Sequence, residues 1–194
     1  MKMLIGLTGK SGSGKTTAAN ILTQLGAFVA DCDTIAHKVL EEDAVKEKLC
    51  ENFGSTIFNN DGSVNRKALG SIVFSDSEKL AVLNGIVHGA ITKKAIDLCI
   101  ASGKDICFID GSELEASGVD EKCAHIVVIY ADEDIRLSRI TERDNISKDS
   151  ALLRIRAQKD YSKKAIIIKN NGGYDELKLA LTKVYRNLLE EIDV

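Results

Sequence analysis

The sequence lacks a long apolar stretch. No segment of its 194 residues approaches the ~20 consecutive apolar residues that a membrane-spanning helix requires. The apolar run within MKMLIGLTG, at the start of the chain, is too short for a signal peptide and continues directly into a glycine-rich loop. We therefore expect a cytoplasmic location and no association with a membrane.

Closely spaced cysteines are also absent. The five cysteines are odd in number, widely separated and never arranged as C-x-x-C: Cys32, Cys50, Cys99, Cys107 and Cys123. This pattern is typical of reduced, mostly buried thiols, and it argues against a disulfide framework or a zinc site. Because 44% of the residues are hydrophobic, a chain of this length can build a core without such cross-links.

An excess of positive charge is missing as well. The formal net charge is −3 at pH 7, whereas a dedicated nucleic-acid-binding protein normally carries a basic excess. We therefore expect no nucleic-acid partner, and a local basic pocket for a small anionic molecule is compatible with this charge. The length fits one sizeable domain with small inserted subdomains, present as a monomer or a small homo-oligomer.

Short, apolar, β-branched runs alternate with helical patterns along the chain. The runs have the length and composition of buried parallel strands: MLIGL, AFVAD, DICFID, HIVVIYA and AIIIK. The helical patterns cover residues 15–25, 33–53, 77–101, 132–143, 148–160 and 175–192. This alternation predicts an α/β fold of three layers, with a mostly parallel five-stranded sheet and helices on both faces.

The spacing of these elements is uneven. Roughly 70 residues separate the strand ending at Asp33 from the strand ending at Asp110, far more than one crossover needs. The excess predicts an inserted helical subdomain at 34–95, with a turn in NDGSVN at 60–65. A second, charged insertion spans about 139–160, and both pieces are candidates for parts that close over substrates. The remaining segments would form the core domain: 1–33, 96–138 and 156–194.

Residues 6–17 read GLTGKSGSGKTT, between the first predicted strand and the first predicted helix. They fill the phosphate-loop pattern G-x-x-x-x-G-K-[ST] and not the dinucleotide pattern G-x-G-x-x-G. In such a loop the glycines let successive N–H groups point inward as an anion-binding nest, and the following helix adds its positive end. Lys15 would bridge the β- and γ-phosphates, and the Thr16 hydroxyl would ligate Mg²⁺. We predict nucleotide binding by the loop residues Gly9, Ser11, Gly12, Ser13, Gly14, Lys15, Thr16 and Thr17.

Two carboxylates end the second predicted strand, in the segment ADCD at 30–33. Because side chains alternate along a strand, we expect Asp31 and Asp33 to share one face at the carboxyl end of the sheet, where ligands of open α/β sheets bind. A carboxylate there accepts the proton of an attacking hydroxyl or holds the magnesium shell. The alternative is that one of the two caps the helix starting near Thr34. We favour a functional role for Asp33 and leave Asp31 open between the two.

Asp110, at the end of DICFID, resembles the aspartate that assists Mg²⁺ binding in P-loop proteins. A GTPase or a motor ATPase would need features that are missing, because the chain has no N/T-K-x-D guanine-reading motif and no paired switch segments. The residues alone therefore indicate a small P-loop kinase that acts on a small molecule.

Further motifs resemble the dephospho-CoA kinase family. In family order, from residue 4 to about 173, the chain contains GLTGKSGSGKT, VADCDTIAH, FGSTIFNNDGSVNRKALGSIVF, LNGIVHGAI, RITER, RIRAQ and IKNNGG. The block at 53–91 discriminates most, because other P-loop kinases lack it. The resemblance implies transfer of the γ-phosphate of ATP, with Mg²⁺, to the ribose 3′-hydroxyl of dephospho-CoA, which is the last step of coenzyme A synthesis.

The resemblance also implies residue roles. Asp33 would be the general base, 34–95 the part that binds dephospho-CoA, and 139–155 the lid. Arg139 and Arg143, at i and i+4 on one helix face, would both reach the transferring phosphates, unless that face is solvated beside Glu142 and Asp144. His88 is open between a role toward the acceptor and a packing role. The other implied positions are Asp31 and Arg66 toward the acceptor, and Gln158 and Asn170 near adenine.

Several residues depart from the family pattern. Lys10 and Ser11 replace Gly-Ile in the loop, and Gly89 stands where proline follows the histidine, in a chain with no proline. The largest departure is IDGSELEASGV at 109–119, where the family has D.PLLFE.G and where Glu115 matches only after a gap. Because that segment normally contributes to the acceptor pocket in the family that the chain resembles, a kinase of the same architecture with another small acceptor is the alternative. A nucleotide-binding regulator without phosphate transfer is a third hypothesis, which the retained catalytic residues disfavour.

Overall fold

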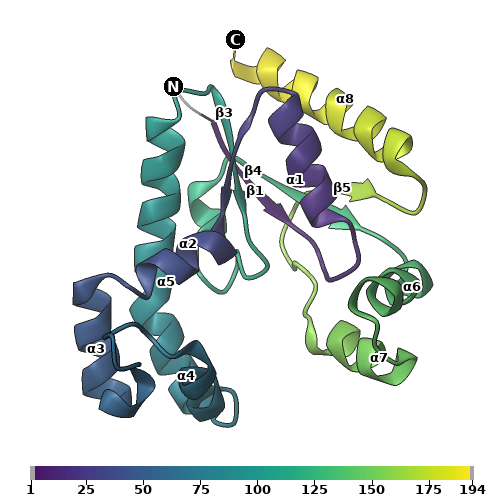
Figure 1. Cartoon of the computed structure of the whole chain (residues 1–194). Coiled ribbons are helices and arrows are strands. Elements are labelled where there is room, and N and C mark those ends of the chain that lie inside the picture. The colour runs from purple at the N-terminus through teal and green to yellow at the C-terminus, as the bar shows by residue number, and fades with distance from the viewer. Residues whose placement is uncertain (1–2, 193–194) are drawn as a thin grey trace. The chain divides into compact units, whose positions relative to one another are not determined.

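The computed structural model describes residues 3–192, which form a five-stranded sheet of order β2-β3-β1-β4-β5 (Figure 1). The strands are β1 (Met3–Thr8), β2 (Phe28–Asp31), β3 (Ile106–Asp110), β4 (His125–Tyr130) and β5 (Ile166–Lys169). Strand β1 pairs with β3 and β4, and β4 pairs with β5, all in parallel. The predicted strands and the mostly parallel α/β fold are confirmed.

The described residues contain eight α-helices. They are α1 (Lys15–Gln24), α2 (Cys32–Val39), α3 (Asp43–Phe53), α4 (Arg66–Val73), α5 (Ser77–Ala101), α6 (Glu133–Asp144), α7 (Lys148–Ala157) and α8 (Tyr174–Ile192). None of the helices between residues 3 and 192 has the length and hydropathy needed to cross a membrane.

The helical region predicted at 33–53 differs from the structure, which divides it into α2 and α3. Helix α2 buries Ile35 and Val39, and α3 buries Val45 and Leu49. The step of six residues between Val39 and Val45 breaks the helical repeat of three or four, so a continuous helix would turn acidic residues inward.

Helix α4 was not predicted, although the Asn65 side chain caps it by accepting a hydrogen bond from the Ala68 N–H at 3.0 Å.

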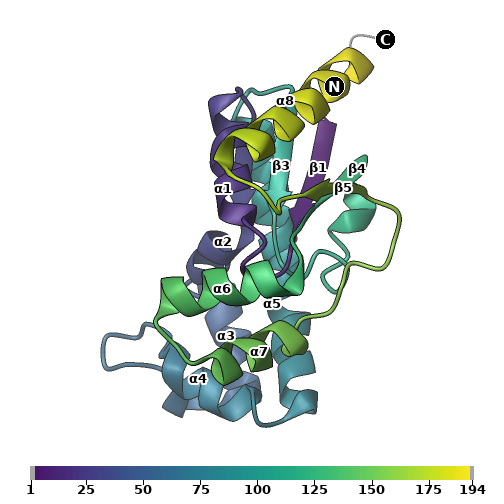
Figure 2. The same ribbon diagram turned by 90° about the vertical axis from the view of Figure 1, so that its right-hand side faces the viewer.

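Both faces of the sheet are covered. On one face, Ile5 and Leu7 of β1 belong to a buried core that also includes residues of α1 and α8 (Figure 2). On the other face, a Cβ atom added at Gly6 would meet the side chains of Ile126 and Leu114. The last turn of α5 lies on β3, where the Cys107 thiol donates to the Cys99 carbonyl at 3.4 Å. This is the predicted arrangement of a sheet between two outer layers.

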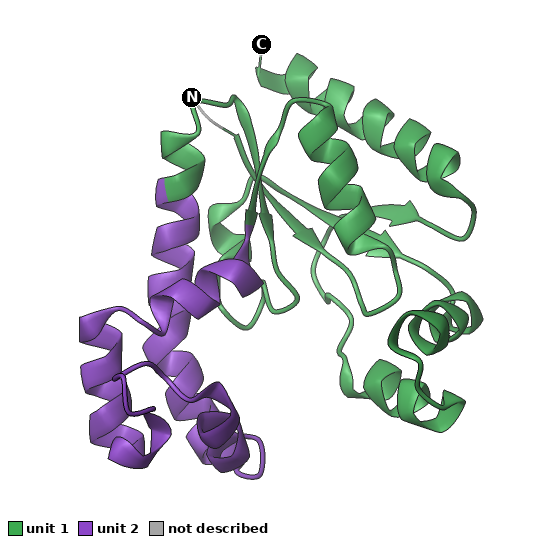
Figure 3. Cartoon of the chain, viewed as in Figure 1, with its two compact units in different colours: residues 1–30, 98–194 green, residues 31–97 purple. Residues whose placement is uncertain are grey.

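The chain forms two compact units (Figure 3). The sheet unit comprises residues 1–30 and 98–194, and the helical unit comprises residues 31–97. In the helical unit, Phe58 and Val64 form an isolated antiparallel bridge, which closes a turn within the segment where the sequence predicts one. Glu41 stabilises that turn by accepting a hydrogen bond from the Val64 N–H at 3.1 Å.

A helical hairpin of α6 and α7 projects from the sheet unit. Its small core consists of Ile140, Ala151 and Ile155. Asn145 ends α6 in the left-handed conformation, at φ 50°, and Ser147 caps α7 by accepting from the Ser150 N–H at 3.2 Å. The hairpin contains the segment 139–155 and extends beyond it at both ends.

Candidate active site

The phosphate loop joins β1 to α1 and depends on two glycines. Gly12 and Gly14 have φ of 79° and 92°, in the region that side chains other than glycine rarely adopt. A Cβ at Gly12 would lie 2.8 Å from the Arg136 carbonyl oxygen, and a Cβ at Gly14 would collide with the Asn170 amide. The glycines therefore permit both the backbone conformation of the loop and its close approach to neighbouring segments.

Lys15 and Asp110 form an ion pair where the phosphate loop enters α1. Lys15 is the first residue of α1 and Asp110 is the last residue of β3, the neighbour of β1 in the sheet. The Lys15 ammonium donates to Asp110 Oδ1, and the two side chains are only 18% and 8% exposed. Parallel strands end at the same edge of the sheet, which is why residues 95 positions apart meet here.

Three distant side chains hold the loop through its backbone. The Asn170 amide donates to the Ser13 carbonyl at 2.7 Å, and Asn170 itself is buried. Arg139 donates to the Gly12 carbonyl at 3.2 Å. The Gln158 side-chain oxygen accepts from the Ser11 N–H at 2.7 Å. The loop is thus fixed by residues of α6 and of the segments that follow α7 and β5.

These contacts add a feature that motif reading missed. The resemblance places Asn170 and Gln158 near adenine, whereas the structure shows both side chains on the phosphate loop. Arg139 also donates to the Gly172 carbonyl at 3.3 Å, so it joins the loop to the segment after β5. The only local signal was the presence of these polar residues next to predicted elements; the contacts span well over 100 positions of the chain.

The oxygen atoms near the loop fit Mg²⁺. The Thr16 hydroxyl and the Asp110 carboxylate are hard oxygen donors at the start of α1 and the end of β3. Among residues 3–192, no group of three His, Cys, Asp or Glu side chains is arranged to hold a metal ion. That finding is compatible with Mg²⁺, which usually binds through one or two protein oxygens together with substrate phosphates.

Arg143 differs from Arg139 in its surroundings. Its side chain is 61% exposed and donates to Asp144 at 2.7 Å. Asp144 also pairs with Arg154 of α7, and the hydrogen bond from Arg143 lowers the pKa of Asp144 below its usual value. Arg143 therefore sits in the acidic, solvated surroundings that the alternative interpretation describes, and its role with phosphate stays a prediction.

The prediction that Asp31 and Asp33 share a strand face is wrong. Strand β2 ends at Asp31 and α2 begins at Cys32, so Asp33 lies in the first turn of a helix. The Asp31 carboxylate accepts from the Asp33 N–H at 2.9 Å and from the Thr34 hydroxyl at 2.7 Å. Asp31 is thus the cap of α2, because its oxygens satisfy N–H groups that the helix leaves unpaired. Asp33 is exposed at the N-terminal end of α2.

The other predicted acceptor residues belong to the helical unit. Arg66 is exposed and is the first residue of α4. His88 is half-buried within α5. The sheet unit thus brings together the loop residues with Lys15, Asp110, Arg139 and Asn170, while Asp31, Asp33, Arg66 and His88 lie in residues 31–97.

Comparisons with known proteins agree with one another. A family model described as dephospho-CoA kinase matches residues 3–176. A dephospho-CoA kinase of Fusobacterium nucleatum is 36% identical over 179 residues, which cover 90% of this chain and 93% of that protein. The dephospho-CoA kinase of Halalkalibacterium halodurans is 36% identical over 192 residues, covering 95% of this chain and 96% of that protein.

Solved structures show the same likeness. A protein from Thermus thermophilus is 28% identical, with a TM-score of 0.82 and coverage of 96% of this chain and 98% of that one. A dephospho-CoA kinase from Campylobacter jejuni is also 28% identical, with a TM-score of 0.67 and coverage of 97% and 98%. Since the family model spans most of the chain and the sequence relatives exceed 30% identity over nearly all of it, the chain belongs to the dephospho-CoA kinase family.

Proposed function

We propose that this kinase transfers the γ-phosphoryl group of ATP to the ribose 3′-hydroxyl of dephospho-CoA, giving coenzyme A and ADP. The observation that carries the proposal is the phosphate loop, in which Lys15 pairs with Asp110. It occurs in a chain whose residues 3–176 match the dephospho-CoA kinase family. Loop N–H groups and the N-terminal end of α1 provide the positive environment that nucleotide phosphates require.

In this proposal the residues of the sheet unit bind ATP and stabilise charge. The Lys15 ammonium neutralises the transferring phosphoryl group, and Arg139 adds a second positive charge beside the loop. Mg²⁺, bound through the Thr16 hydroxyl and the Asp110 carboxylate, would supply further neutralisation of the phosphate oxygens. The hairpin of α6 and α7 would act as the lid that excludes water, with Arg143 as its second phosphate contact.

The helical unit would bind the acceptor. Asp33, exposed at the start of α2, accepts the proton of the 3′-hydroxyl as general base. Arg66 and His88 contact the acceptor, with the arginine suited to a phosphate group. Asp31 supports Asp33 indirectly, because its carboxylate caps the helix turn that carries Asp33.

The test is an assay with Mg-ATP and dephospho-CoA in which ADP and coenzyme A are both measured. We expect equal amounts of the two products and no ADP without the acceptor. Asp33→Asn should lower kcat by about a hundredfold or more, as expected for loss of a general base. Asp43→Asn is the matched control, because Asp43 is also an exposed carboxylate in the first turn of a helix of the same unit. Full activity of Asp33→Asn would remove Asp33 from the mechanism.

A second acceptor is tested in the same experiment. The segment 109–119 departs from the family pattern, and its Glu115 is bonded within the sheet unit to Ser162. If ATP binds and coenzyme A does not form, a screen of other small hydroxyl acceptors decides between a different kinase and a nucleotide-binding regulator. Turnover with dephospho-CoA above that with all other acceptors establishes the proposal.

We further propose a cytoplasmic location. All five cysteines lie among the described residues and none of them forms a disulfide, which suits a reducing compartment. Its partners would be small molecules, without nucleic acid or membrane, and the chain would act as a monomer or a small homo-oligomer.

A further inference from the structure

The segment between α7 and β5 contacts two loops of the sheet unit, the phosphate loop and the loop that follows β3. We call residues 158–163 the strap. It has no helix or strand of its own, since α7 ends at Ala157 and β5 begins at Ile166. Its first residue closes the last turn of α7, where the Gln158 N–H donates to the Ile155 carbonyl at 3.4 Å, and side-chain contacts hold the strap at both ends.

The first end of the strap holds the phosphate loop. The Gln158 side-chain oxygen accepts from the Ser11 N–H at 2.7 Å. Two residues later, the Asp160 carboxylate pairs with the Lys10 ammonium at 2.8 Å. Asp160 is 78% exposed, so its ion pair adds little, and the hydrogen bond from Ser11 is the stronger restraint.

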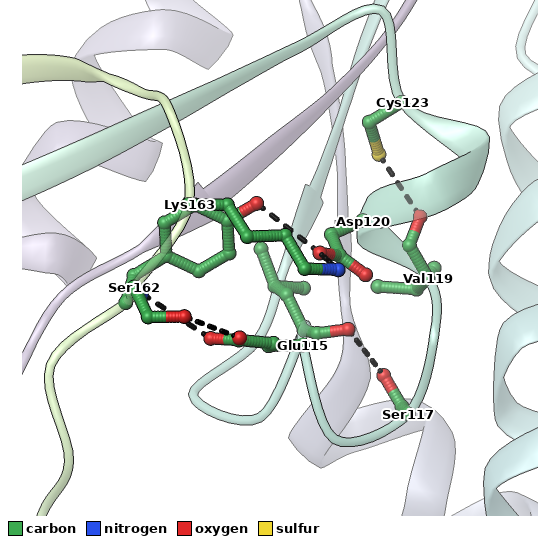
Figure 4. Close-up of polar contacts among 9 residues, drawn as sticks. Glu115, Ser117, Val119, Asp120, Cys123, Ser162 and Lys163 are labelled. Carbon is green, nitrogen blue, oxygen red and sulfur yellow. Dashed lines mark hydrogen bonds and ion pairs between the residues drawn. The ribbon is translucent and has the colours of Figure 1, made fainter.

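The second end is anchored on the loop that follows β3 (Figure 4). Asp120 begins a 3-10 turn, and its side chain is only 2% exposed. Its Oδ2 accepts from the Lys163 ammonium at 2.7 Å and from the Tyr161 hydroxyl at 3.1 Å. Nearby, Glu115 accepts from both the N–H and the hydroxyl of Ser162. Three consecutive strap residues are thus bonded to one loop.

The Asp120 contacts are strong because the carboxylate is buried. Burial by itself would raise the pKa of Asp120, but the hydrogen bonds from Lys163 and Tyr161 outweigh it, and the net pKa lies below the usual value. Burial, together with the hydrogen bond to Asp120, raises the pKa of Tyr161 to about 12. The carboxylate is therefore charged at neutral pH, and removing its partners leaves a buried charge uncompensated.

We propose that Asp120 is a positioning residue for nucleotide binding: it anchors the strap, and the strap keeps Gln158 against Ser11 of the phosphate loop. Asp120 itself need not touch the nucleotide. The inference rests on the proposed binding of ATP at this loop, and it adds residues that neither the loop motif nor the proposed chemistry uses.

The test is a double-mutant cycle on the full chain, with ADP binding measured by calorimetry and Tm measured alongside. Gln158→Ala should weaken ADP binding about fivefold, as expected for one lost hydrogen bond. Asp120→Asn should weaken ADP binding about threefold, since the strap becomes more mobile but keeps its contact with the phosphate loop. If Asp120 acts through Gln158, the double variant binds ADP about fivefold more weakly than wild type, like Gln158→Ala alone. Independent effects would multiply to about fifteenfold and overturn the proposal.

Controls separate positioning from general stability. Glu191→Gln changes a carboxylate of the same unit that contacts His125 Nε2 at 2.9 Å and involves neither the strap nor the loop. It should change Tm slightly and leave ADP binding unchanged. Tyr161→Phe removes only the hydroxyl that donates to Asp120, so it tests the same anchor if Asp120→Asn does not fold. It should weaken ADP binding about twofold.

The outcomes are distinct. Unchanged ADP binding in both Tyr161→Phe and Asp120→Asn would overturn the inference and leave the proposed kinase function intact. Absence of ADP binding by the wild-type chain would overturn the proposed function and the inference together. A reduced Tm in Asp120→Asn with the non-additive loss of ADP affinity would establish Asp120 as the anchor.

Discussion

Replacing Asn170 with alanine removes the side chain that orients the centre of the phosphate loop. Asn170 is 6% exposed, and its amide donates to the Ser13 carbonyl at 2.7 Å. The peptide bond is planar and trans, so holding the Ser13 carbonyl on one side points the Gly14 N–H to the opposite side. Asn170 therefore fixes the direction of an N–H group that the nucleotide phosphates are expected to use.

The size of the effect follows from the burial of the contact. Loss of a buried hydrogen bond that leaves a carbonyl unpaired costs about 1–3 kcal/mol. For a chain of this size, a loss of about 2 kcal/mol lowers Tm by about 4–8 °C. Because the freed peptide can then rotate, we also expect ADP binding to weaken about tenfold. Asn170→Asp should be more damaging still, since it places a charged oxygen beside the Ser13 carbonyl oxygen.

The assay combines thermal unfolding with calorimetric titration of ADP. Asn171→Ala is a matched control, because Asn171 is the same residue type, adjacent in sequence, exposed and bonded to Asp132. Its loss should cost no more than about 1 kcal/mol, as water replaces the missing partner. Wild-type Tm and affinity in Asn170→Ala would refute the reasoning. Weaker ADP binding at an unchanged Tm would instead support the contact with adenine that the sequence resemblance implies.

Three further predictions concern other parts of the sheet unit. Arg139→Ala should reduce steady-state ADP release about a hundredfold, since it removes both a positive charge and the link between the phosphate loop and the segment after β5. Burial, with a smaller effect of Asp120, raises the pKa of Cys123 to about 12. Alkylation at pH 8 followed by peptide mass spectrometry should therefore modify the exposed Cys50 before the half-buried Cys123. Because the pKa of Asp120 is lowered in the folded protein, its carboxylate stabilises the fold above its usual pKa of 3.8, and this stabilisation is lost as pH falls below that value. The Tm difference between wild type and Asp120→Asn should therefore shrink as pH is lowered from about 5 to about 3. A constant difference would contradict this.

The elements that local sequence determines were predicted well. The strands have the apolar, β-branched composition of a buried sheet, and all five were predicted, although β2 ends at Asp31 and not at Asp33. The phosphate loop is equally local, because Gly12 and Gly14 must adopt positive φ and Lys15 must begin the following helix. Family membership followed from the same property, since its motifs are short and occur in a definite order.

Errors arose where two local patterns compete. In ADCD, alternation along a strand and capping of a helix are both compatible with the residues, and the structure selects capping, with Asp31 bonded to the first turn of α2. Likewise, 33–53 is helical in composition throughout, but the burial of Val39 and Val45 requires a break between two helices. Propensity describes each segment alone, whereas burial depends on what the segment packs against.

The sequence by itself determined the sheet, the phosphate loop and the family, because each depends on residues that are close together in the chain. Only the tertiary structure decided which side chains hold the loop: Asn170, Arg139 and Gln158 reach it across more than 100 positions, and Asp120 anchors the strap from a loop 43 positions before Lys163. Polar side chains of this kind carry no periodic pattern. Their partners are set by where the strands and helices end in space, and that position is a property of the packed fold.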